Sequence, residues 1–202
     1  MKNNKILVVM GGTSGEREVS LKSGQACIKA LKKKGYNVSS FDPKKKSLNL
    51  INKRKTDVIF NALHGKDGED GIAQSYFEYL RIPYTHSGVI SSYNAMNKII
   101  SKEVYKDNKI KTPSYLVISK SNFTWAKIKR SIKGNKIKFP LVIKPIDEGS
   151  SIGVNICKNI KDLNKAIKFL FKKYEQLLCE NYIWGQEIQV AVLNSIPLGA
   201  IE

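Results

Sequence analysis

Apolar and polar positions alternate in short blocks through the first half of the chain. Residues 5–10 and 57–61 are apolar runs that predict buried strands, and 37–41 predicts a third. Apolar residues at helical spacing predict a helix over 19–31, ended by Gly35, and another over 71–80, with a short strand near 83–85. Strands that alternate with helices predict a parallel sheet covered by helices, and this α/β unit ends near residue 95.

The second half has a different order of predicted helices and strands. Its pattern predicts helices over 98–108, 123–133 and from about 159 to 174, and strands over 115–118, 140–145, 154–157, 176–181, 186–193 and 197–202. A Gly/Ser turn joins 140–145 to 154–157 in a hairpin-like pair, so we expect an α+β architecture here. The chain ends inside the last predicted strand, and we therefore expect it to be a fragment of a longer protein.

The composition is that of a folded protein without membrane spans. Of the 202 residues 42% are hydrophobic, and no apolar run approaches the ~20 residues that cross a bilayer. The apolar run at the N-terminus is too short for a signal peptide. Cys27, Cys157 and Cys179 form no paired pattern, which fits buried thiols in a reducing compartment, and we expect the cytoplasm.

The formal charge of +18 would suit a nucleic-acid binder, but its distribution does not. Residues 1–100 hold 17 Lys+Arg against 8 Asp+Glu, and residues 101–202 hold 18 against 9. The excess is spread evenly rather than gathered in a stripe or tail, and only four of the basic residues are Arg. We therefore expect a lysine-rich surface and no nucleic-acid partner, which retention on DNA with a steep salt dependence would contradict.

Two loops follow predicted strands at the edge of the parallel sheet where ligands bind. Residues 11–15, Gly-Gly-Thr-Ser-Gly, form a strand-to-helix turn whose amides can face an anion, and Glu16 adds a carboxylate for an ammonium group. After strand 57–61, His64 begins a polar, glycine-rich loop that we interpret as functional. A tight turn and a surface loop are the structural alternatives, and His86 at a third strand end is interpreted as structural.

Two further segments suit nucleotide chemistry. Lys144 ends a strand beside the Gly-Ser-Ser-Ile-Gly turn at 149–153, whose small residues allow amides and hydroxyls to close over phosphate oxygens. Glu180 and Glu187 flank an aromatic and aliphatic stretch, suited to an adenine amino group and ribose hydroxyls. The alternatives are a β-turn with an exposed lysine and two solvent-facing glutamates, and the residues alone leave the glutamates undecided.

In order and spacing, these segments resemble the D-alanine–D-alanine ligase family of ATP-grasp enzymes, from about residue 5 to the last residue. Any one matching string is weak, whereas all of them in order are specific. The matching strings are Gly11 to Ser20, Ala62-Leu63-His64-Gly65 with Gly68-Glu69-Asp70-Gly71, Pro83-Tyr84-Thr85, Ser87-Gly88, Lys98, and Lys144-Pro145 with Glu148 to Val154.

The resemblance implies an α/β, Rossmann-like substrate-binding domain over 1–95 and a central α+β ATP-grasp subdomain over 96–185. Residues 186–202 would begin a C-terminal ATP-grasp subdomain that is incomplete here. The implied reaction is phosphorylation of a first D-alanine by ATP, followed by attack of the amine of a second D-alanine on the acyl phosphate. The implied setting is peptidoglycan precursor synthesis by a cytoplasmic homodimer.

The same resemblance assigns roles to individual residues. Glu16 would bind the ammonium of the first D-alanine, with His64 near its carboxylate. Ser150 would join a network with Glu16 and help to place the second substrate, so that Glu16 and Ser150 serve catalysis. The nucleotide would be held by Lys98 and Lys144 at the phosphates, Ser151 over them, Glu180 and Ile183 at adenine, and Glu187 at the ribose.

The family also has functional positions that would follow residue 202. They include a loop tyrosine, a phosphate-binding lysine, an arginine and the Asp, Glu and Asn that hold Mg²⁺ (or Mn²⁺). We therefore expect no metal ligands in this chain and no ligase turnover from it alone. A ligase that takes D-lactate as its second substrate, and a non-catalytic module that holds D-alanine or nucleotide, remain as alternatives.

Overall fold

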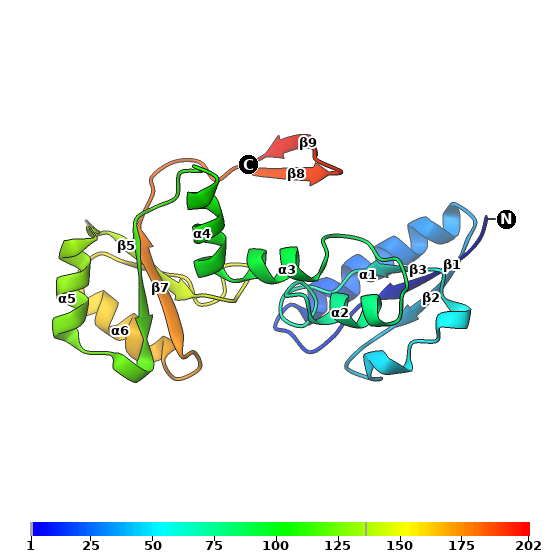
Figure 1. The fold of residues 1–202 in the computed structure, drawn as a ribbon, viewed down its shortest axis with the longest axis horizontal. Coiled ribbons are helices and arrows are strands. Elements are labelled where there is room, and N and C mark those ends of the chain that lie inside the picture. The colour runs from blue at the N-terminus through cyan, green and yellow to red at the C-terminus, as the bar shows by residue number, and fades with distance from the viewer. Residues whose placement is uncertain (1, 136) are drawn as a thin grey trace.

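The computed structural model describes residues 2–135 and 137–202, which form two lobes and a separate hairpin (Figure 1). The first lobe has a parallel sheet with strand order β2-β1-β3. Its elements are β1 (Lys2–Val9), α1 (Arg17–Lys33), β2 (Tyr36–Phe41), β3 (Val58–Asn61) and α2 (Ile72–Tyr79), with two short 3-10 turns at Leu48–Leu50 and Lys53–Lys55. The predicted parallel α/β unit is confirmed.

Helices cover both faces of this sheet because alternate residues of β1 point to opposite sides. Leu7 and Val9 pack in a cluster with Phe77 of α2, whereas Ile6 and Val8 pack in another cluster on the side of α1. A strand buried on both faces is what a short, fully apolar run predicts.

The second lobe has an antiparallel sheet with strand order β4-β7-β5-β6. Its elements are α4 (Lys98–Asp107), β4 (Tyr115–Ser119), a 3-10 turn (Lys120–Asn122), α5 (Trp125–Gly134), β5 (Leu141–Pro145), β6 (Asn155–Cys157), α6 (Ile160–Leu170) and β7 (Gln176–Asn181). The predicted α+β character and the hairpin of β5 and β6 around the Gly/Ser turn are confirmed.

The two faces of the second sheet differ. Leu141 and Ile143 of β5 and Cys179 of β7 point into the core, together with the apolar stripe of α6. The alternation therefore puts Lys144 and Glu180 on the opposite face, where they lie diagonally across the β5–β7 pair. The strand pattern thus decides which polar side chains of the lobe are available for a site.

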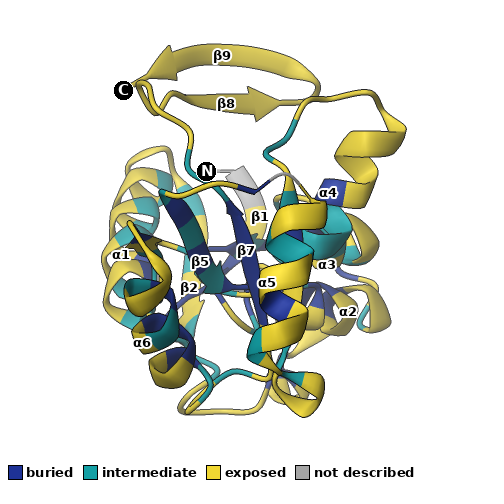
Figure 2. Ribbon diagram, turned by 90° about the vertical axis from the view of Figure 1, so that its left-hand side faces the viewer, coloured by how far each residue is buried: buried dark blue, intermediate teal, exposed yellow. Residues whose placement is uncertain are grey.

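Two elements lie outside these lobes. Helix α3 (Val89–Met96) leads directly into α4 between the lobes (Figure 1). Strands β8 (Gln189–Leu193) and β9 (Ile196–Ile201) pair as an antiparallel hairpin that is exposed along its whole length (Figure 2). The predicted division at 95/96 and 185/186 stays a prediction.

The sequence pattern failed at two places in this fold. The strand expected near 83–85 is a single bridge between Ile59 and Tyr84, since only one residue pair meets β3 there. Helix α3 was not predicted, and the Gly88 that precedes it offers no side-chain cap, so no local start signal marks it. No helix in the described part of the chain is long and apolar enough to cross a membrane.

Candidate functional site

The glycine turn after β1 is held rigidly by side chains from its surroundings. Gly11 and Gly12 have φ of +90° and +72°, and the Gly11 amide donates to the Ser20 hydroxyl at 2.8 Å. Asp42, directly after β2, accepts a hydrogen bond from the Gly12 amide at 3.1 Å. It also accepts hydrogen bonds from two guanidinium nitrogens of Arg17, at 3.0 and 2.7 Å. The turn therefore presents the start of α1 in one fixed position.

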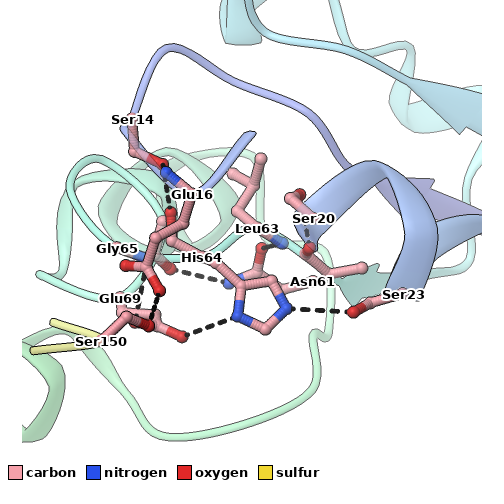
Figure 3. A network of polar contacts seen from close by, with 12 residues as sticks. Ser14, Glu16, Ser20, Ser23, Asn61, Leu63, His64, Gly65, Glu69 and Ser150 are labelled. Atoms are coloured by element: carbon pink, nitrogen blue, oxygen red, sulfur yellow. Dashed lines mark hydrogen bonds and ion pairs between the residues drawn. The ribbon is translucent and has the colours of Figure 1, made fainter. Parts of the chain in front are cut away.

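Glu16 stands at the N-cap of α1, where the helix dipole favours a carboxylate. Its side chain accepts a hydrogen bond from Ser150 of the second lobe (Figure 3). A Cβ atom at Gly65 would come within 2.5 Å of the Glu16 carboxylate, and one at Gly149 within 3.1 Å. Glycines of two loops, one from each lobe, therefore lie directly against the carboxylate, at positions where a side chain would collide with it or crowd it.

His64 lies beside Glu16 in the loop that follows β3. Its Nδ1 is 3.6 Å from a carboxylate oxygen of Glu69, and its Nε2 is 3.3 Å from the Ser23 hydroxyl (Figure 3). The Ser14 hydroxyl donates to the His64 carbonyl at 2.6 Å and so ties the two loops together. Because β1 and β3 are adjacent parallel strands, their carboxyl ends bring both predicted residues to one edge of the sheet.

The Gly/Ser turn at 149–153 extends from the second lobe toward this edge. Ser150, Ser151 and Gly153 have φ of 45°, 58° and +74°. Two backbone hydrogen bonds close the turn, from Ile152 to Gly149 at 2.9 Å and from Val154 to Ser151 at 3.2 Å. This left-handed conformation is costly for serine, and strained backbone of this kind is concentrated at ligand sites. Both serines are exposed, and Ser150 donates to Glu16.

Lys98 and Lys144 line the same side of the second lobe. The Lys98 ammonium donates to the Glu148 carbonyl at 2.5 Å, and burial together with the charge of Lys144 lowers the pKa of Lys98. Lys144 forms an ion pair with Glu180. The predicted phosphate lysines are therefore close enough to repel each other, a repulsion that a bound anion would relieve.

Glu180 is buried and has two cationic partners. Besides Lys144 it binds the Lys102 ammonium at 2.8 Å, and only 9% of its side chain is exposed. Burial alone would raise the pKa of Glu180, but the hydrogen bonds from Lys102 and Lys144 outweigh it and hold the pKa below its usual value. The sequence left open whether Glu180 faces solvent, and the structure shows that it does not.

Ile183 and Glu187 lie in the exposed segment between β7 and β8, beyond the point where β7 leaves the sheet. Ile183 is 66% exposed. The structure does not bring them to Lys98 or Lys144, so their predicted adenine and ribose contacts stay predictions.

Sequence reasoning missed Lys102, Glu148 and Glu69 as members of these networks. Glu148 accepts from the Tyr174 hydroxyl at 2.8 Å and from Lys173 at 3.0 Å, at the wall of a cleft of about 520 Å³ that Glu16 also lines. The only local signal for Lys102 was its spacing of four from Lys98 on one helix, which places both on one face.

Among residues 2–135 and 137–202, no group of three or more His, Cys, Asp or Glu side chains is placed to hold a metal ion.

Two family models match the chain. One, described as the D-Ala D-Ala ligase N-terminus, matches residues 39–87, and the other, described as the D-Ala D-Ala ligase C-terminus, matches residues 104–201. A Pelagibacter ubique protein named D-alanine--D-alanine ligase is 48% identical over 198 residues, which are 98% of this chain and 64% of that protein.

Solved structures are similar over the same part of their length. The D-alanine--D-alanine ligase of Bacillus anthracis has a TM-score of 0.86 at 34% identity, covering 98% of this chain and 63% of that one. The same enzyme complexed with ATP has a TM-score of 0.81 at 31% identity, covering 96% of this chain and 64% of that one. The chain thus spans less than two thirds of the length of these relatives.

Proposed function

The chain belongs to the D-alanine–D-alanine ligase family, and from this premise we propose that the whole protein joins two D-alanines into D-alanyl-D-alanine with ATP. The observation that supports this most directly is the contact between Glu16 and Ser150. These residues are 134 positions apart, and they meet between the loop that follows a parallel strand and the Gly/Ser turn of the other lobe. An amino-acid site next to a phosphate-covering turn is what such a ligase requires.

In the proposed site Glu16 binds the ammonium of the first D-alanine, and His64 lies near its carboxylate. The cleft of about 520 Å³ that Glu16 lines supports this, because it is large enough for an amino acid. Ser150 holds the Glu16 carboxylate and helps to place the second D-alanine. Fixed charges at the N-terminus of a helix act without reorganisation when substrate binds.

For the nucleotide we propose that Lys98 and Lys144 neutralise the phosphates and that Ser151 and neighbouring amides cover them. Glu180 and Ile183 would contact adenine, and Glu187 the ribose. Support comes from the two crowded lysines and from the strained turn beside them. Among the described residues no cluster of three or more His, Cys, Asp or Glu side chains is placed to hold a metal ion. We propose that the Asp, Glu and Asn of the family pattern, which match no position of residues 1–202, hold Mg²⁺ (or Mn²⁺).

The proposed reaction has two steps. A carboxylate oxygen of the first D-alanine attacks the γ-phosphorus of ATP, and ADP leaves. The amine of the second D-alanine then attacks the acyl carbon, loses a proton and expels phosphate. Dividing amide formation in this way replaces one difficult step with two easier ones, and positioning supplies much of the rate.

We also propose the setting of this function. The product would serve peptidoglycan precursor synthesis in the cytoplasm, in a homodimer, without a nucleic-acid or membrane partner. The three cysteines are all free thiols, which suits a reducing compartment. For residues 1–202 on their own we propose binding without turnover, because the loop tyrosine, the arginine and the Mg²⁺ ligands of the family match none of these positions.

The substrate site is tested by calorimetry of residues 1–202 with D-alanine. We expect Glu16→Gln to weaken binding about tenfold or more, because hydrogen bonds to charged groups contribute about 1.5–3 kcal/mol. Glu18→Gln is the matched control, since Glu18 is an exposed carboxylate in the same helical turn. Equal binding by both variants and the parent would contradict the proposed role of Glu16.

Turnover is tested in the whole protein by product analysis with ATP, Mg²⁺ and D-alanine, with and without D-lactate. D-alanyl-D-alanine as the product supports the proposal. An ester product would favour a ligase that uses D-lactate, and ligand binding without any product would favour a non-catalytic module. Formation of the dipeptide by residues 1–202, above a Lys144→Ala control, would contradict the proposed lack of turnover.

A further inference from the structure

Lys102 is a buried cation whose donors are all used. It lies on α4, and 6% of its side chain is exposed. Its ammonium donates to the Thr112 hydroxyl at 2.7 Å and to the Pro113 carbonyl at 3.0 Å, and it pairs with Glu180 at 2.8 Å. An ammonium has three N–H donors, so these partners satisfy Lys102 completely and hold it in one orientation.

Lys144 has a different environment. It pairs with the other carboxylate oxygen of Glu180, yet 22% of its side chain is exposed and no second partner on the described chain holds its ammonium. Glu180 therefore has one buried cation whose donors are all used, and one partly exposed cation whose ammonium has no second partner on the described chain. Lys98 lies near Lys144, and the repulsion between the two ammonium groups helps to lower the pKa of Lys98.

We propose that Lys102 is a positioning residue that keeps Glu180 paired, so that Lys144 can move its ammonium from Glu180 to a phosphate of the nucleotide. The inference rests on the proposed binding of ATP by Lys144. Removing one partner of a buried ion pair is strongly unfavourable because the remaining charge is left unpaired. With Lys102 in place, Glu180 keeps a direct partner when Lys144 leaves. Without Lys102, Lys144 would be the one direct ion-pair partner of Glu180 among the described residues, and its departure would leave a buried carboxylate without a direct partner.

The geometry of the strands explains why the two lysines differ. Lys144 follows the register of β5 and approaches Glu180 diagonally across the sheet, near the carboxyl end of the strand. Lys102 reaches Glu180 from α4, and the low exposure of both side chains shows that this pair is buried. A surface salt bridge would not show this asymmetry, because both of its partners would exchange freely with water.

The experiment measures binding of ATP and of tripolyphosphate to residues 1–202 by calorimetry. We expect Lys102→Met to weaken both about 10- to 100-fold, a range typical of coupled ion-pair networks. Tripolyphosphate has no adenine, so a parallel loss for both ligands locates the effect at the phosphates. Lys106→Met is the matched control, because Lys106 lies one turn further along α4 with 76% of its side chain exposed.

A double variant distinguishes the positioning role of Lys102 from a general loss of structure at the site. In Lys102→Met combined with Glu180→Gln no carboxylate remains to retain Lys144, so affinity for tripolyphosphate should return to within about threefold of Glu180→Gln alone. Lys102→Arg, which keeps the charge, should bind close to the parent. Failure of the double variant to recover, with folding confirmed by circular dichroism, would overturn the proposal.

Acetylation of Lys144, measured by mass spectrometry, gives a readout that does not need a nucleotide. Reactivity should rise in Glu180→Gln and fall in Lys102→Met relative to the parent, and the reverse order would overturn the proposal. If the parent binds neither ATP nor tripolyphosphate, the proposed nucleotide site fails. If the parent binds both and Lys102→Met binds equally well, only the role of Lys102 fails.

Discussion

The Asp42 anchor of the glycine turn offers a direct test of how the first lobe holds its site. Asp42 accepts four hydrogen bonds, two from Arg17 and one each from the Gly12 and Lys44 amides, and 12% of its side chain is exposed. The hydrogen bond from Arg17 is the main cause that lowers the pKa of Asp42 from 3.8 to about 2, against the opposing effect of burial. Asp42→Asn keeps the shape and removes the charge.

The pKa sets the size and the pH window of the effect. A carboxylate whose pKa is lower in the folded than in the unfolded state stabilises the fold above the unfolded value and loses this contribution as pH falls through the folded value. At about 1.36 kcal/mol per pKa unit, the change from 3.8 to about 2 corresponds to at most about 2 kcal/mol. Screening near the surface reduces this, and we expect about 1 kcal/mol at neutral pH.

The assay is urea unfolding of the parent and Asp42→Asn at neutral pH and at about pH 3. The variant should be less stable at neutral pH, and about half of the difference should be gone by about pH 3, where the unfolded carboxyl is largely protonated. Asp107→Asn is the control, because Asp107 is exposed at the end of α4 and its replacement should change stability by less than about 0.5 kcal/mol. Equal stability of Asp42→Asn and parent at neutral pH, or a difference unchanged at about pH 3, would refute the reasoning.

Two further predictions concern packing and thiol chemistry. Gly24→Ala should destabilise the first lobe by about 1–3 kcal/mol, because the new Cβ would lie 2.4 Å from the sulfur of Met10. Gly134→Ala is the control, because a Cβ there would have no atom within 4 Å, and it should be neutral or stabilising in the same denaturation series. In the folded protein at about pH 8, iodoacetamide should modify Cys27 first, because burial raises the pKa of Cys157 to about 11 and that of Cys179 to about 12. Mass spectrometry that finds Cys157 or Cys179 modified as fast as Cys27 would contradict this expectation.

The main elements of the fold could be predicted from the chain because their causes are local. The apolar stripe of α6 predicts a helix with one buried face, and the apolar run of β1 predicts a strand with both faces buried. Asn159 marks the start of α6, because its side chain accepts hydrogen bonds from two backbone amides. Helix α3 could not be predicted, since neither a cap nor a clear stripe marks it and its place between the lobes decides it. The strand predicted near 83–85 was overestimated for the opposite reason, because strand-forming residues were present but only one of them, Tyr84, pairs with β3.

The sequence by itself determined which loops carry the candidate site. Strand-to-loop transitions place Glu16 and His64 at carboxyl strand ends, and glycine and serine spacing locates the turn of Ser150 and Ser151. Only the tertiary structure decided which of these groups meet. The contact of Ser150 with Glu16 joins two lobes, and the burial of Lys102 distinguishes one lysine from many others that look identical in sequence. The physical reason is that pairing and burial are set by the sheet register and by helix packing, which bring together residues far apart in the chain, whereas sequence patterns report only near neighbours.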